Sequence, residues 1–507
     1  MALDANRQDL VTAVVGTGTM GRGIAQTLAQ AGVRVRLFDS KEGAVNSALS
    51  SITDVLGKQV EKGKLSKQML DGTLANLVPA YSLNELSDCD VVIEAVLENL
   101  EIKRELFRSL DGIVSRDAIL ASYTSSLSIA AVAAGSRHPD RVCGWHFFNP
   151  VPLMKIAEVV QGSLTAPWVT DAMTVLTRRI GHAAVLAKDM PGFVVNHGGR
   201  AFGPEAIRLA SEGVADFHVI DQIMRDCAGF RMGPFELLDL IGLDVAQLVM
   251  ESLYHQYYEE PRFRLAPFIG QRVAAGLHGR KTQRGCYVYK DGALVPVPEL
   301  PIPPRPGFPV WISDAEPELA ERLRTALHAE RVRTENGPTP SPQALIIVTP
   351  LGLDTSTCCT ELGLDPRRTV AVDALFPLNR RRTLMCSPAT APEYRQAAHG
   401  LLGAAGVPVS IIRDSPGFVA QRIVAQIVSI GSDIAQQRIA NPGDIDTAVR
   451  LGLGYPNGPL SMGDAIGPAR VLKILEGISS FYQEPRYRAS PWLKRRAQLG
   501  LSLLQED

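Results

Sequence analysis

The hydrophobic positions at the start of the chain follow a strand pattern, then a helical pattern, then a strand pattern again. Val11–Val15 and Val33–Phe38 are short apolar runs of the β type, and Met20–Gln30 between them has helical spacing. A glycine-rich segment, residues 16–21 (GTGTMG), joins the first run to the helix, and Asp39 follows the second run. The pattern predicts a strand, turn, helix and strand in that order.

This order of elements, with an acid after the second strand, is typical of a dinucleotide-binding site. Gly16 permits the tight turn, Gly18 lets the backbone approach a pyrophosphate, and Gly21 lets helix and strand pack closely. The helix N-terminus supplies free N–H groups for the phosphates. Asp39 stands where a carboxylate binds the ribose hydroxyls and repels a 2′-phosphate, so NAD is expected rather than NADP. Three basic residues nearby keep NADP open: Arg34, Arg36 and Lys41.

Three more apolar runs bring polar residues towards one edge of the predicted sheet. They are Val91–Val96, which carries Glu94, Ala118–Ser122, which precedes Ser125, and Arg141–Phe148, which carries His146. Because α/β sheets bind ligands at the carboxyl ends of their strands, these ends are expected to converge on the nicotinamide. A helix is expected over Ala44–Val60. Lys58 and Lys62, four positions apart, are by themselves most simply part of a solvated face.

The candidate chemistry is concentrated between Tyr123 and Glu158. This stretch holds a hydroxyl-rich turn with Ser125, then His146 in an aromatic strand end, then Glu158 twelve positions later. An imidazole can take a proton near neutral pH. A carboxylate against its other nitrogen fixes the tautomer and stabilises the charged form. A single His between aromatic residues is more often a packed strand residue, so this interpretation depends on the rest of the chain.

After Lys188 the pattern becomes mainly helical, and it then repeats. Residues 188–196 (KDMPGFVVN) return as 413–421 (RDSPGFVAQ), and residues 232–242 (MGPFELLDLIG) return as 457–467 (NGPLSMGDAIG), both at an offset of 225. Residues 258–268 return as 482–492 at an offset of 224. The helical domain is therefore predicted to be duplicated. The expected helices of the first copy are Ala201–Ser211, Val219–Cys227, Pro234–Leu240 and Val245–Tyr258.

We therefore expect an α/β plus all-α chain. The expected parts are a Rossmann-type NAD-binding domain (1–188), a helical domain (189–290), a linker region that is proline-rich at its start (291–343), a reduced Rossmann-like unit (344–413) and a second helical domain (414–507). The reduced unit has no glycine motif. Aligning Pro377 with Pro150 places Asp373 at the position of His146 and Met385 at that of Glu158.

Gln421 replaces Asn196 in the second helical copy, so one active site is predicted. The Arg380–Arg382 run is most simply a solvated surface, with an anion site as the alternative.

Composition narrows the class of protein. Of 507 residues 46% are hydrophobic and 21% charged, as in globular proteins with full cores. A net charge of −1 gives no electrostatic reason to expect nucleic acid or a membrane surface as a partner. Seven cysteines without a C-x-x-C or a His/Cys cluster suggest neither a disulfide framework nor a metal site. The start lacks signal-peptide features and no run of about 18 apolar residues occurs, so a cytoplasmic protein is expected.

Five motifs (SSLSI, GWHFFNPVPLMKIAEVV, DMPGFVVN, MGPFELLDLIGLD and GRKTQRG) closely resemble the (3S)-hydroxyacyl-CoA dehydrogenases. These enzymes oxidise 3-hydroxyacyl-CoA to 3-ketoacyl-CoA with NAD. The resemblance, over about residues 10–290, implies that His146 is the catalytic base, Glu158 its partner, and that Ser125 and Asn196 hold the substrate's 3-oxygen. It implies a set of NAD contacts: Gly16, Gly18, Thr19, Met20, Gly21, Asp39, Glu98, Lys103, Asn149 and Lys281.

The same resemblance places Lys62, and less firmly Lys58, at the coenzyme A phosphates. Two positions depart from the family pattern: Tyr123, where Asn is usual, and His197, where Arg is usual.

The tandem arrangement resembles bacterial short-chain and dicarboxylic enzymes, including those that act on 3-hydroxyadipyl-CoA in phenylacetate breakdown. The alternatives are 3-hydroxybutyryl-CoA as substrate and, more remotely, a sugar-acid dehydrogenase or an idle NAD-binding scaffold. Candidate cations for a terminal carboxylate are Arg200, Arg231 and the arginines near 262. Single-copy members dimerise through the helical domain, so we expect a homodimer or a pseudo-dimer within one chain.

Overall fold

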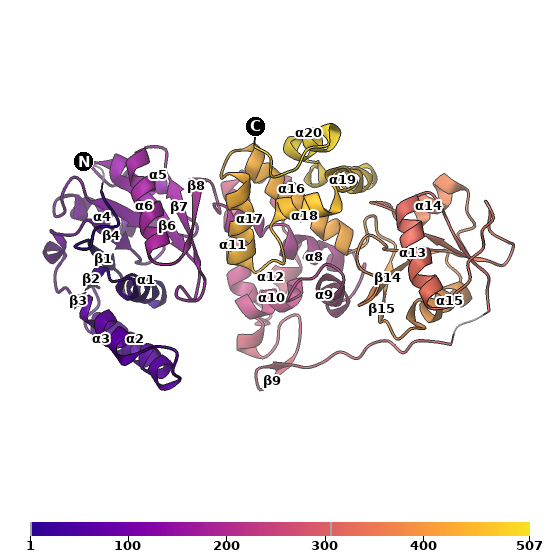
Figure 1. Ribbon diagram of the computed structural model, residues 1–507, viewed down its shortest axis with the longest axis horizontal. Coiled ribbons are helices and arrows are strands. Elements are labelled where there is room, and N and C mark those ends of the chain that lie inside the picture. Colours follow the sequence, from indigo (N-terminus) through magenta and orange to yellow (C-terminus); the bar gives the residue numbers. More distant parts are fainter. Residues whose placement is uncertain (1–2, 305–306, 507) are drawn as a thin grey trace. The chain divides into compact units, whose positions relative to one another are not determined.

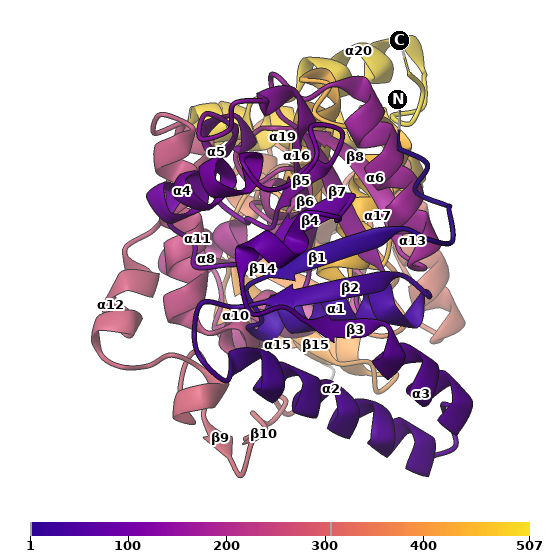
Figure 2. The same ribbon diagram turned by 90° about the vertical axis from the view of Figure 1, so that its left-hand side faces the viewer.

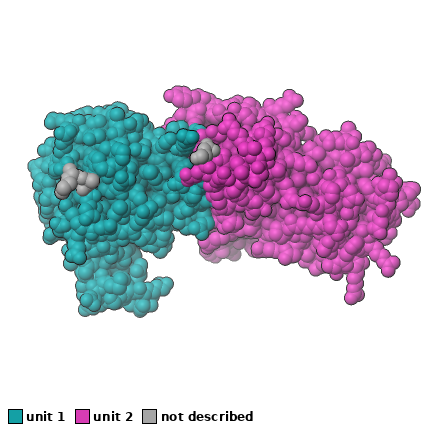
Figure 3. Space-filling view, turned by 45° about the horizontal axis from the view of Figure 1, so that its top comes forward, with its two compact units in different colours: residues 1–197, 437–454 teal, residues 198–436, 455–507 magenta. Residues whose placement is uncertain are grey.

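The computed structural model describes residues 3–304 and 307–506, so residues 305–306 of the proline-rich stretch lie outside the description. The chain divides into two compact units (Figure 3). Unit 1 contains the residues up to 197 together with 437–454, and unit 2 contains 198–436 together with the residues from 455 onwards. Each unit is therefore built from segments that are distant in the sequence.

Unit 1 is organised around an eight-stranded sheet in the order β3-β2-β1-β4-β5-β6-β7-β8. All neighbours are parallel except β6 and β7, so the predicted doubly wound dinucleotide fold is confirmed. The strands are β1 (Val11–Val15), β2 (Arg34–Phe38), β3 (Leu77–Pro79), β4 (Val91–Glu94), β5 (Ile119–Ser122), β6 (Val142–Phe147), β7 (Ile156–Gln161) and β8 (Ala183–Lys188).

The central strands are buried and mostly apolar because helices cover both faces of the sheet. These helices are α1 (Thr19–Gln30), α2 (Ala44–Glu61), α3 (Lys67–Ala75), α4 (Leu100–Asp111), α5 (Ile129–Ala133) and α6 (Pro167–Arg179), and the short α7 (Val195–Gly198) follows β8. Residues 83–86 and 139–141 form single 3₁₀ turns. Figure 2 shows α2 and α3 as a helical pair beyond the β3 end of the sheet.

The open edge of this sheet, at β8, is closed by a helix from the second helical copy. Helix α17 (Pro442–Leu453) packs against β7 and β8. The N–H of Lys188 donates to the carbonyl of Ile439 at 2.8 Å, and the N–H of Leu186 donates to the carboxylate of Asp444 at 3.3 Å. An uncovered edge strand would leave such groups unpaired. The NAD-binding fold is therefore completed by residues 437–454.

The remaining helices of the two helical copies lie in unit 2 (Figure 1). The first copy contributes α8 (Phe202–Ser211), α9 (Phe217–Asp226), α10 (Pro234–Ile241), α11 (Leu243–Gln256) and α12 (Phe268–Ala274). The second contributes α16 (Ala420–Gln436), α18 (Pro459–Ile466), α19 (Pro468–Tyr482) and α20 (Pro491–Leu499). With α17 counted, the helices correspond one to one along the repeat. Smaller elements are the β9 (Tyr289–Lys290) and β10 (Ala293–Leu294) hairpin and 3₁₀ turns at 261–263, 280–282 and 485–487.

A second sheet in unit 2 is a shortened version of the first. Its five strands are β11 (Val310–Ile312), β12 (Leu345–Val348), β13 (Thr369–Val372), β14 (Arg382–Cys386) and β15 (Val409–Arg413), flanked by α13 (Pro317–Ala329), α14 (Thr355–Leu362) and α15 (Pro392–Gly403). Their order and directions match β4 to β8, with one antiparallel pair between the third and fourth strands. Within the described residues, the reduced Rossmann-like unit therefore lacks the counterparts of β1 to β3. It also takes in β11 and α13, which lie in the region 291–343 that was predicted to be a linker.

The strand register corrects one alignment made from the sequence. Cys386 pairs with Arg413 as Gln161 pairs with Lys188, so Thr383, beside Ser410, holds the place of Glu158. The prediction of Met385 at that place was wrong. The N–H of Asp373 donates to the carbonyl of Thr383, which keeps Asp373 at the position of His146. The hairpin between these positions is two residues shorter in the second copy, and alignment from a single proline does not reveal such a shortening.

The interpretation of Arg380–Arg382 as a solvated surface was wrong for two of the three residues. Arg380 is exposed, but the other two guanidinium groups are buried at the start of β14. Arg381 donates to Asp226 at 2.8 Å and to Glu299, and Arg382 pairs with Glu330. Buried guanidinium groups require such partners, and these come from elements far away in the sequence.

In the described ranges, no helix is both long enough and apolar enough to cross a membrane.

Candidate active site

The glycine turn between β1 and α1 has the geometry that a dinucleotide requires. Gly16 has a φ of +95°, and a Cβ there would lie 2.5 Å from the carbonyl oxygen of Ala95. A Cβ on Gly21 would lie 1.9 Å from the carbonyl oxygen of Gly16, whereas a Cβ on Gly18 would meet nothing within 4 Å. The first and third glycines are thus required by packing, and the second leaves the backbone open to a ligand. Helix α1 begins at Thr19, and no side chain caps its N-terminus. The N–H groups of its first residues, Thr19 and Met20, therefore face this opening.

Asp39 closes the other side of the turn. Its carboxylate accepts hydrogen bonds from the N–H and hydroxyl of Thr17, at 2.7 and 2.9 Å, and from the N–H of Lys41 at 2.9 Å. Burial acts to raise the pKa of Asp39, but the hydrogen bonds from Thr17 and Lys41 outweigh it and hold that pKa below the usual value. The acid is therefore ionised at neutral pH, as a ribose-binding carboxylate must be.

Lys103 lies beneath the loop that carries Ser125. Its side chain is fully buried, and its ammonium contacts Glu94 at 2.6 Å, the carbonyl of Tyr123 at 2.8 Å and Glu98 at 3.4 Å. Burial raises the pKa of Glu94 although the charge of Lys103 acts against it. This geometry supports a positioning role for Lys103 and gives no support to a direct NAD contact.

Glu98 holds the serine loop from its exposed side. One carboxylate oxygen accepts hydrogen bonds from the hydroxyls of Thr124 and Ser126, at 2.7 and 2.8 Å, and from the N–H groups of Ser125 and Ser126. Burial would raise the pKa of Glu98, but these bonds and the charge of Lys103 lower it. The hydroxyl of Ser125 makes no hydrogen bond within the described part of the chain, so it remains free to bind a substrate oxygen.

His146 and Glu158 face each other across the antiparallel pair β6 and β7. Nδ1 of His146 lies 2.6 Å from Oε2 of Glu158, and both side chains are buried. The other oxygen of Glu158 accepts hydrogen bonds from the N–H groups of Val194 and Val195, at 2.9 and 3.0 Å. Because the carboxylate accepts at Nδ1, the tautomer with Nε2 unprotonated is favoured. The pair therefore presents a base whose orientation is fixed from behind.

Three aromatic rings surround this imidazole. Their centroids lie 5.9 Å (Tyr123), 4.6 Å (Phe148) and 5.6 Å (Phe193) from that of His146. Tyr123 is stacked at 30°, so the residue that replaces the usual Asn lies directly beside the base. Burial, followed by the charge of Glu98, raises the pKa of Tyr123 to about 12, so its hydroxyl stays protonated.

The other predicted residues divide between the two units. Asn196 follows Val195, which brings it next to the His146–Glu158 pair, and Asn149 is exposed just after Phe148. Lys58 and Lys62 are exposed at the C-terminal end of α2. Lys281 belongs to unit 2, where its ammonium lies 2.6 Å from Asp244.

Sequence reasoning missed Thr17 and the backbone donors of Val194 and Val195. The DMPGF motif was the only signal for these donors, because a backbone N–H leaves no mark on residue type.

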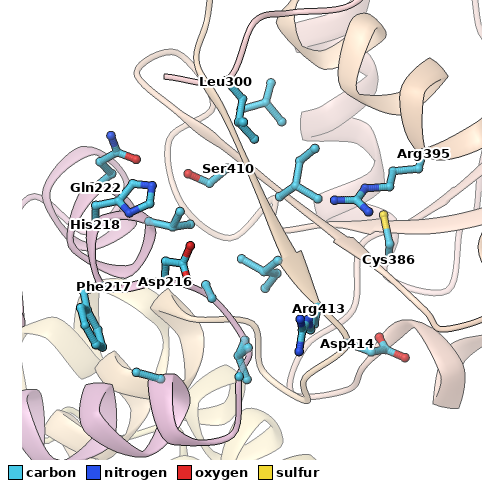
Figure 4. A pocket seen from close by; sticks show the side chains of 18 of the residues that line it. Asp216, Phe217, His218, Gln222, Leu300, Cys386, Arg395, Ser410, Arg413 and Asp414 are labelled. Atoms are coloured by element: carbon cyan, nitrogen blue, oxygen red, sulfur yellow. The ribbon is translucent and has the colours of Figure 1, made fainter. Parts of the chain in front are cut away.

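A large cavity lies elsewhere in the protein. It has a volume of about 1000 Å³ and is lined within unit 2 by residues that include Asp216, His218, Cys386, Arg395 and Arg413 (Figure 4). None of the predicted site residues lines it. The predicted base and its acid lie instead in unit 1, together with the glycine turn.

Comparison with known proteins identifies the same domains. Residues 11–190 match the family described as 3-hydroxyacyl-CoA dehydrogenase, NAD binding domain, and residues 192–289 and 417–503 each match the C-terminal domain of that family. The duplication and the NAD-binding domain are thereby confirmed.

Relatives of full length and of half length are both found. The 3-hydroxyadipyl-CoA dehydrogenase of Escherichia coli K12 is 34% identical over 488 residues, which cover 96% of this chain and 97% of the relative. The 3-hydroxybutyryl-CoA dehydrogenase of Clostridioides difficile is 40% identical over 277 residues, which cover 55% of this chain and 98% of the relative. A crystal structure of 3-hydroxybutyryl-CoA dehydrogenase from E. coli K12 has a TM-score of 0.84 at 34% identity and covers 97% of this chain and 98% of its own. The chain thus belongs to the 3-hydroxyacyl-CoA dehydrogenase family of NAD-binding oxidoreductases, with the C-terminal domain present twice.

Proposed function

We propose that the protein oxidises (3S)-3-hydroxyacyl-CoA esters with a short or dicarboxylic acyl chain, and that 3-hydroxyadipyl-CoA is its main substrate. The observation that carries the reaction is the 2.6 Å contact between His146 and Glu158, with Glu158 held in turn by two backbone donors. The acyl preference is supported by the full-length similarity to the E. coli 3-hydroxyadipyl-CoA dehydrogenase.

In this proposal His146 is the general base. Nε2 takes the proton of the 3-hydroxyl group, and Glu158 stabilises the imidazolium that forms. The free hydroxyl of Ser125, on a loop fixed by Glu98, holds the 3-oxygen together with Asn196. When bound, NAD supplies the chemistry of hydride acceptance from C3. Lys58 and Lys62 remain the proposed contacts of the coenzyme A phosphates.

The chain's own residues fit the cofactor. The open backbone at Gly18 and the uncapped N-terminus of α1 suit the pyrophosphate, and the ionised Asp39 suits the ribose hydroxyls. Asn149 and Lys281 stay predictions for the remaining NAD contacts.

The second candidate substrate is 3-hydroxybutyryl-CoA. It is supported by the 40% identity of the N-terminal half to the C. difficile enzyme of that name. A dicarboxylic substrate needs a cation for its terminal carboxylate. Arg262 is buried and paired with Asp433, which removes it from the candidates, whereas Arg231 is exposed.

The test compares kcat/KM for 3-hydroxyadipyl-CoA and 3-hydroxybutyryl-CoA, with NAD saturating. We expect the adipyl substrate to be favoured by at least about tenfold, since a lost charge-assisted hydrogen bond typically costs about that much or more. A preference for the butyryl substrate would replace the acyl assignment and leave the reaction class intact. Absence of NADH formation with either substrate would contradict the proposed reaction.

We also propose that the two helical copies form a pseudo-dimer within one chain. Support comes from unit 2, where α8 of the first copy packs against α16 of the second. The cytoplasmic location expected from the sequence stays a prediction.

A further inference from the structure

The contact between the helical copies contains a buried cluster of charges and tyrosines. Arg422, on α16 of the second copy, contacts Glu205 of the first copy at 2.6 Å and both oxygens of Glu212 at 2.8 and 3.0 Å. Arg486 contacts the second oxygen of Glu205 at 2.8 Å. The side chains of Glu205 and Arg422 are almost completely buried. Burial acts to raise the pKa of Glu205, but Arg486 and Arg422 outweigh it and lower that pKa to about 2.

Two tyrosines of the second copy complete the cluster. The hydroxyl of Tyr487 accepts from Arg422 at 2.6 Å and donates to Glu205 at 2.8 Å, and that of Tyr482 donates to Glu212 at 2.8 Å. The carboxylates that Arg422 and Arg486 bind thus come from the first copy, and the phenols bound to them come from the second. Two neighbouring ion pairs run the other way, since Arg208 and Arg262 of the first copy bind Glu484 and Asp433 of the second. The buried cluster itself therefore has a direction.

The repeat shows that this cluster has no mirror image. At the offset of 225, the counterpart of Glu205 is Ile430, that of Glu212 is Gln437 and that of Arg422 is His197. At the offset of 224, the counterpart of Tyr487 is Phe263. A true two-fold contact uses the same residues on both sides. Here each member of the cluster except Arg486 and Tyr482 is replaced by a residue of different charge or polarity in the other copy.

A contact between two identical copies would therefore be unfavourable. Two first copies would bury Glu205 with one arginine instead of two, because Arg262 stands at the position of Arg486 but His197 stands at that of Arg422. Two second copies would bury Arg422 without a carboxylate, because Ile430 and Gln437 hold the acidic positions. Burying a charge without its partner costs more free energy than the contact returns.

From this we infer that the surface through which the two helical copies meet is specific for the unlike copy. The first helical copy accepts only the second, and neither copy accepts its like. Within one chain, the first copy packs against the second through this surface. Two chains could associate through it only if the first copy of each chain packed against the second copy of the other. His197, one of the two departures from the family pattern, is the position in the first copy where the arginine is lost.

The test uses the full chain with a site-specific protease sequence inserted between Leu300 and Pro301, both of which are exposed. After cleavage of the folded protein, native mass spectrometry is expected to show one particle that contains one copy of each fragment. Dilution then gives the dissociation constant of the two fragments. Particles that contain two copies of one fragment and none of the other would overturn the inference.

Variants isolate the cluster from the other contacts between the fragments. Arg422→Glu is expected to raise the dissociation constant at least about 100-fold, because it places a carboxylate against Glu205 and Glu212. Arg495→Glu is the matched control, since it makes the same charge change at an exposed site of the second copy and leaves the constant unchanged. Equal constants for the two variants would overturn the inference.

A milder variant decides the matter if Arg422→Glu does not fold. Tyr487→Phe keeps the ring and removes only the hydroxyl that links Arg422 to Glu205. With the circular dichroism spectrum unchanged, we expect the dissociation constant to rise about tenfold. A dissociation constant equal to that of the wild type would show that the cluster does not hold the copies together, and would overturn the inference.

Discussion

The two oxygens of Glu158 have separate tasks. Oε2 binds Nδ1 of His146, and Oε1 binds the N–H groups of Val194 and Val195. The backbone therefore fixes the acid, and the acid fixes the base. The motif predicted the identity of both side chains, since they come from a recognisable stretch. It did not predict the distance between them, which depends on the register of β6 and β7.

Replacing the base tests this arrangement most directly. His146→Gln is expected to lower kcat by about 10²–10⁴-fold, because the proton of the 3-hydroxyl group loses its acceptor. The dissociation constant of NAD, measured by fluorescence, should stay unchanged because the glycine turn is untouched. An unchanged kcat would contradict the role of His146.

Asp39 is proposed to bind the cofactor without taking part in the chemical step. Asp39→Ala removes an ionised carboxylate from the place of the ribose hydroxyls, and we expect the KM for NAD to rise about 10–100-fold. The kcat at saturating NAD should change little. A fall in kcat with an unchanged KM for NAD would mean that Asp39 acts in the chemical step instead of in cofactor binding.

Asp373, at the position of His146 in the second copy, is a buried acid that is not paired with a base among the described residues. It accepts hydrogen bonds from Gln421 at 3.0 Å and from the N–H of Leu375 at 3.2 Å, and burial raises its pKa to about 6 despite the nearby charge of Arg322. The folded protein keeps this proton up to about pH 6, whereas an unfolded chain releases it near pH 4. Its contribution to stability is therefore present below pH 4 and is lost as the pH rises to about 6.

Asp373→Asn removes that dependence. Relative to the wild type, the free energy of unfolding of the variant should increase by about 3 kcal/mol between pH 4 and pH 7, as measured by urea denaturation. Asp291→Asn, at an exposed position, is the control and should show no such trend. An equal difference between Asp373→Asn and wild type at both pH values would refute this account.

At the scale of elements, the periodic pattern predicted most strands and helices of the first half. It predicted less in the second half. β11 has only three residues, too few for a period to be recognised. The two-residue shortening before β14 shifted the alignment of Met385, and the buried arginines of β14 looked like a surface run. In each case the deciding partner lies far away in the sequence.

Helix α17 is the clearest case, because nothing in residues 437–454 indicates that they complete a domain formed by the first 197 residues. Its Gly452 packs against the catalytic side of that domain. A Cβ at this position would lie 2.7 Å from Cγ1 of Val195, whose N–H binds Glu158.

Gly452→Ala therefore displaces a stiff side chain next to the His146–Glu158 pair. We expect kcat to fall about 10–100-fold, because small displacements of a catalytic group are costly, while the KM for NAD is unchanged. Gly443→Ala is the matched control on the same helix, where a Cβ meets only Asn441 Oδ1 at 3.5 Å. Equal activity of the two variants would separate α17 from the active site.

At the scale of the whole molecule, the second sheet is a shorter version of the first in the described part of the chain. The second sheet keeps the counterparts of β4 to β8 and lacks those of β1 to β3, and the glycine turn goes with the missing strands. The nucleotide half of the fold is thus absent, while the half that packs against a helical copy remains.

One NAD per chain is the expected stoichiometry. Calorimetric titration of the 507-residue protein should give a binding number close to one. Asp39→Ala should weaken that single event and reveal no second one. A binding number of two would mean that the second sheet binds nucleotide by another geometry.

The closure of β8 by α17 also has a consequence for synthesis on the ribosome. The strands of the NAD-binding domain are all made by residue 188, but the segment that covers their edge ends at residue 454. At a synthesis rate of roughly 5–20 residues per second, the edge of β8 stays uncovered in the nascent chain for on the order of 10–50 s. We therefore expect any dependence of this domain on chaperones to last until residue 454 has been made.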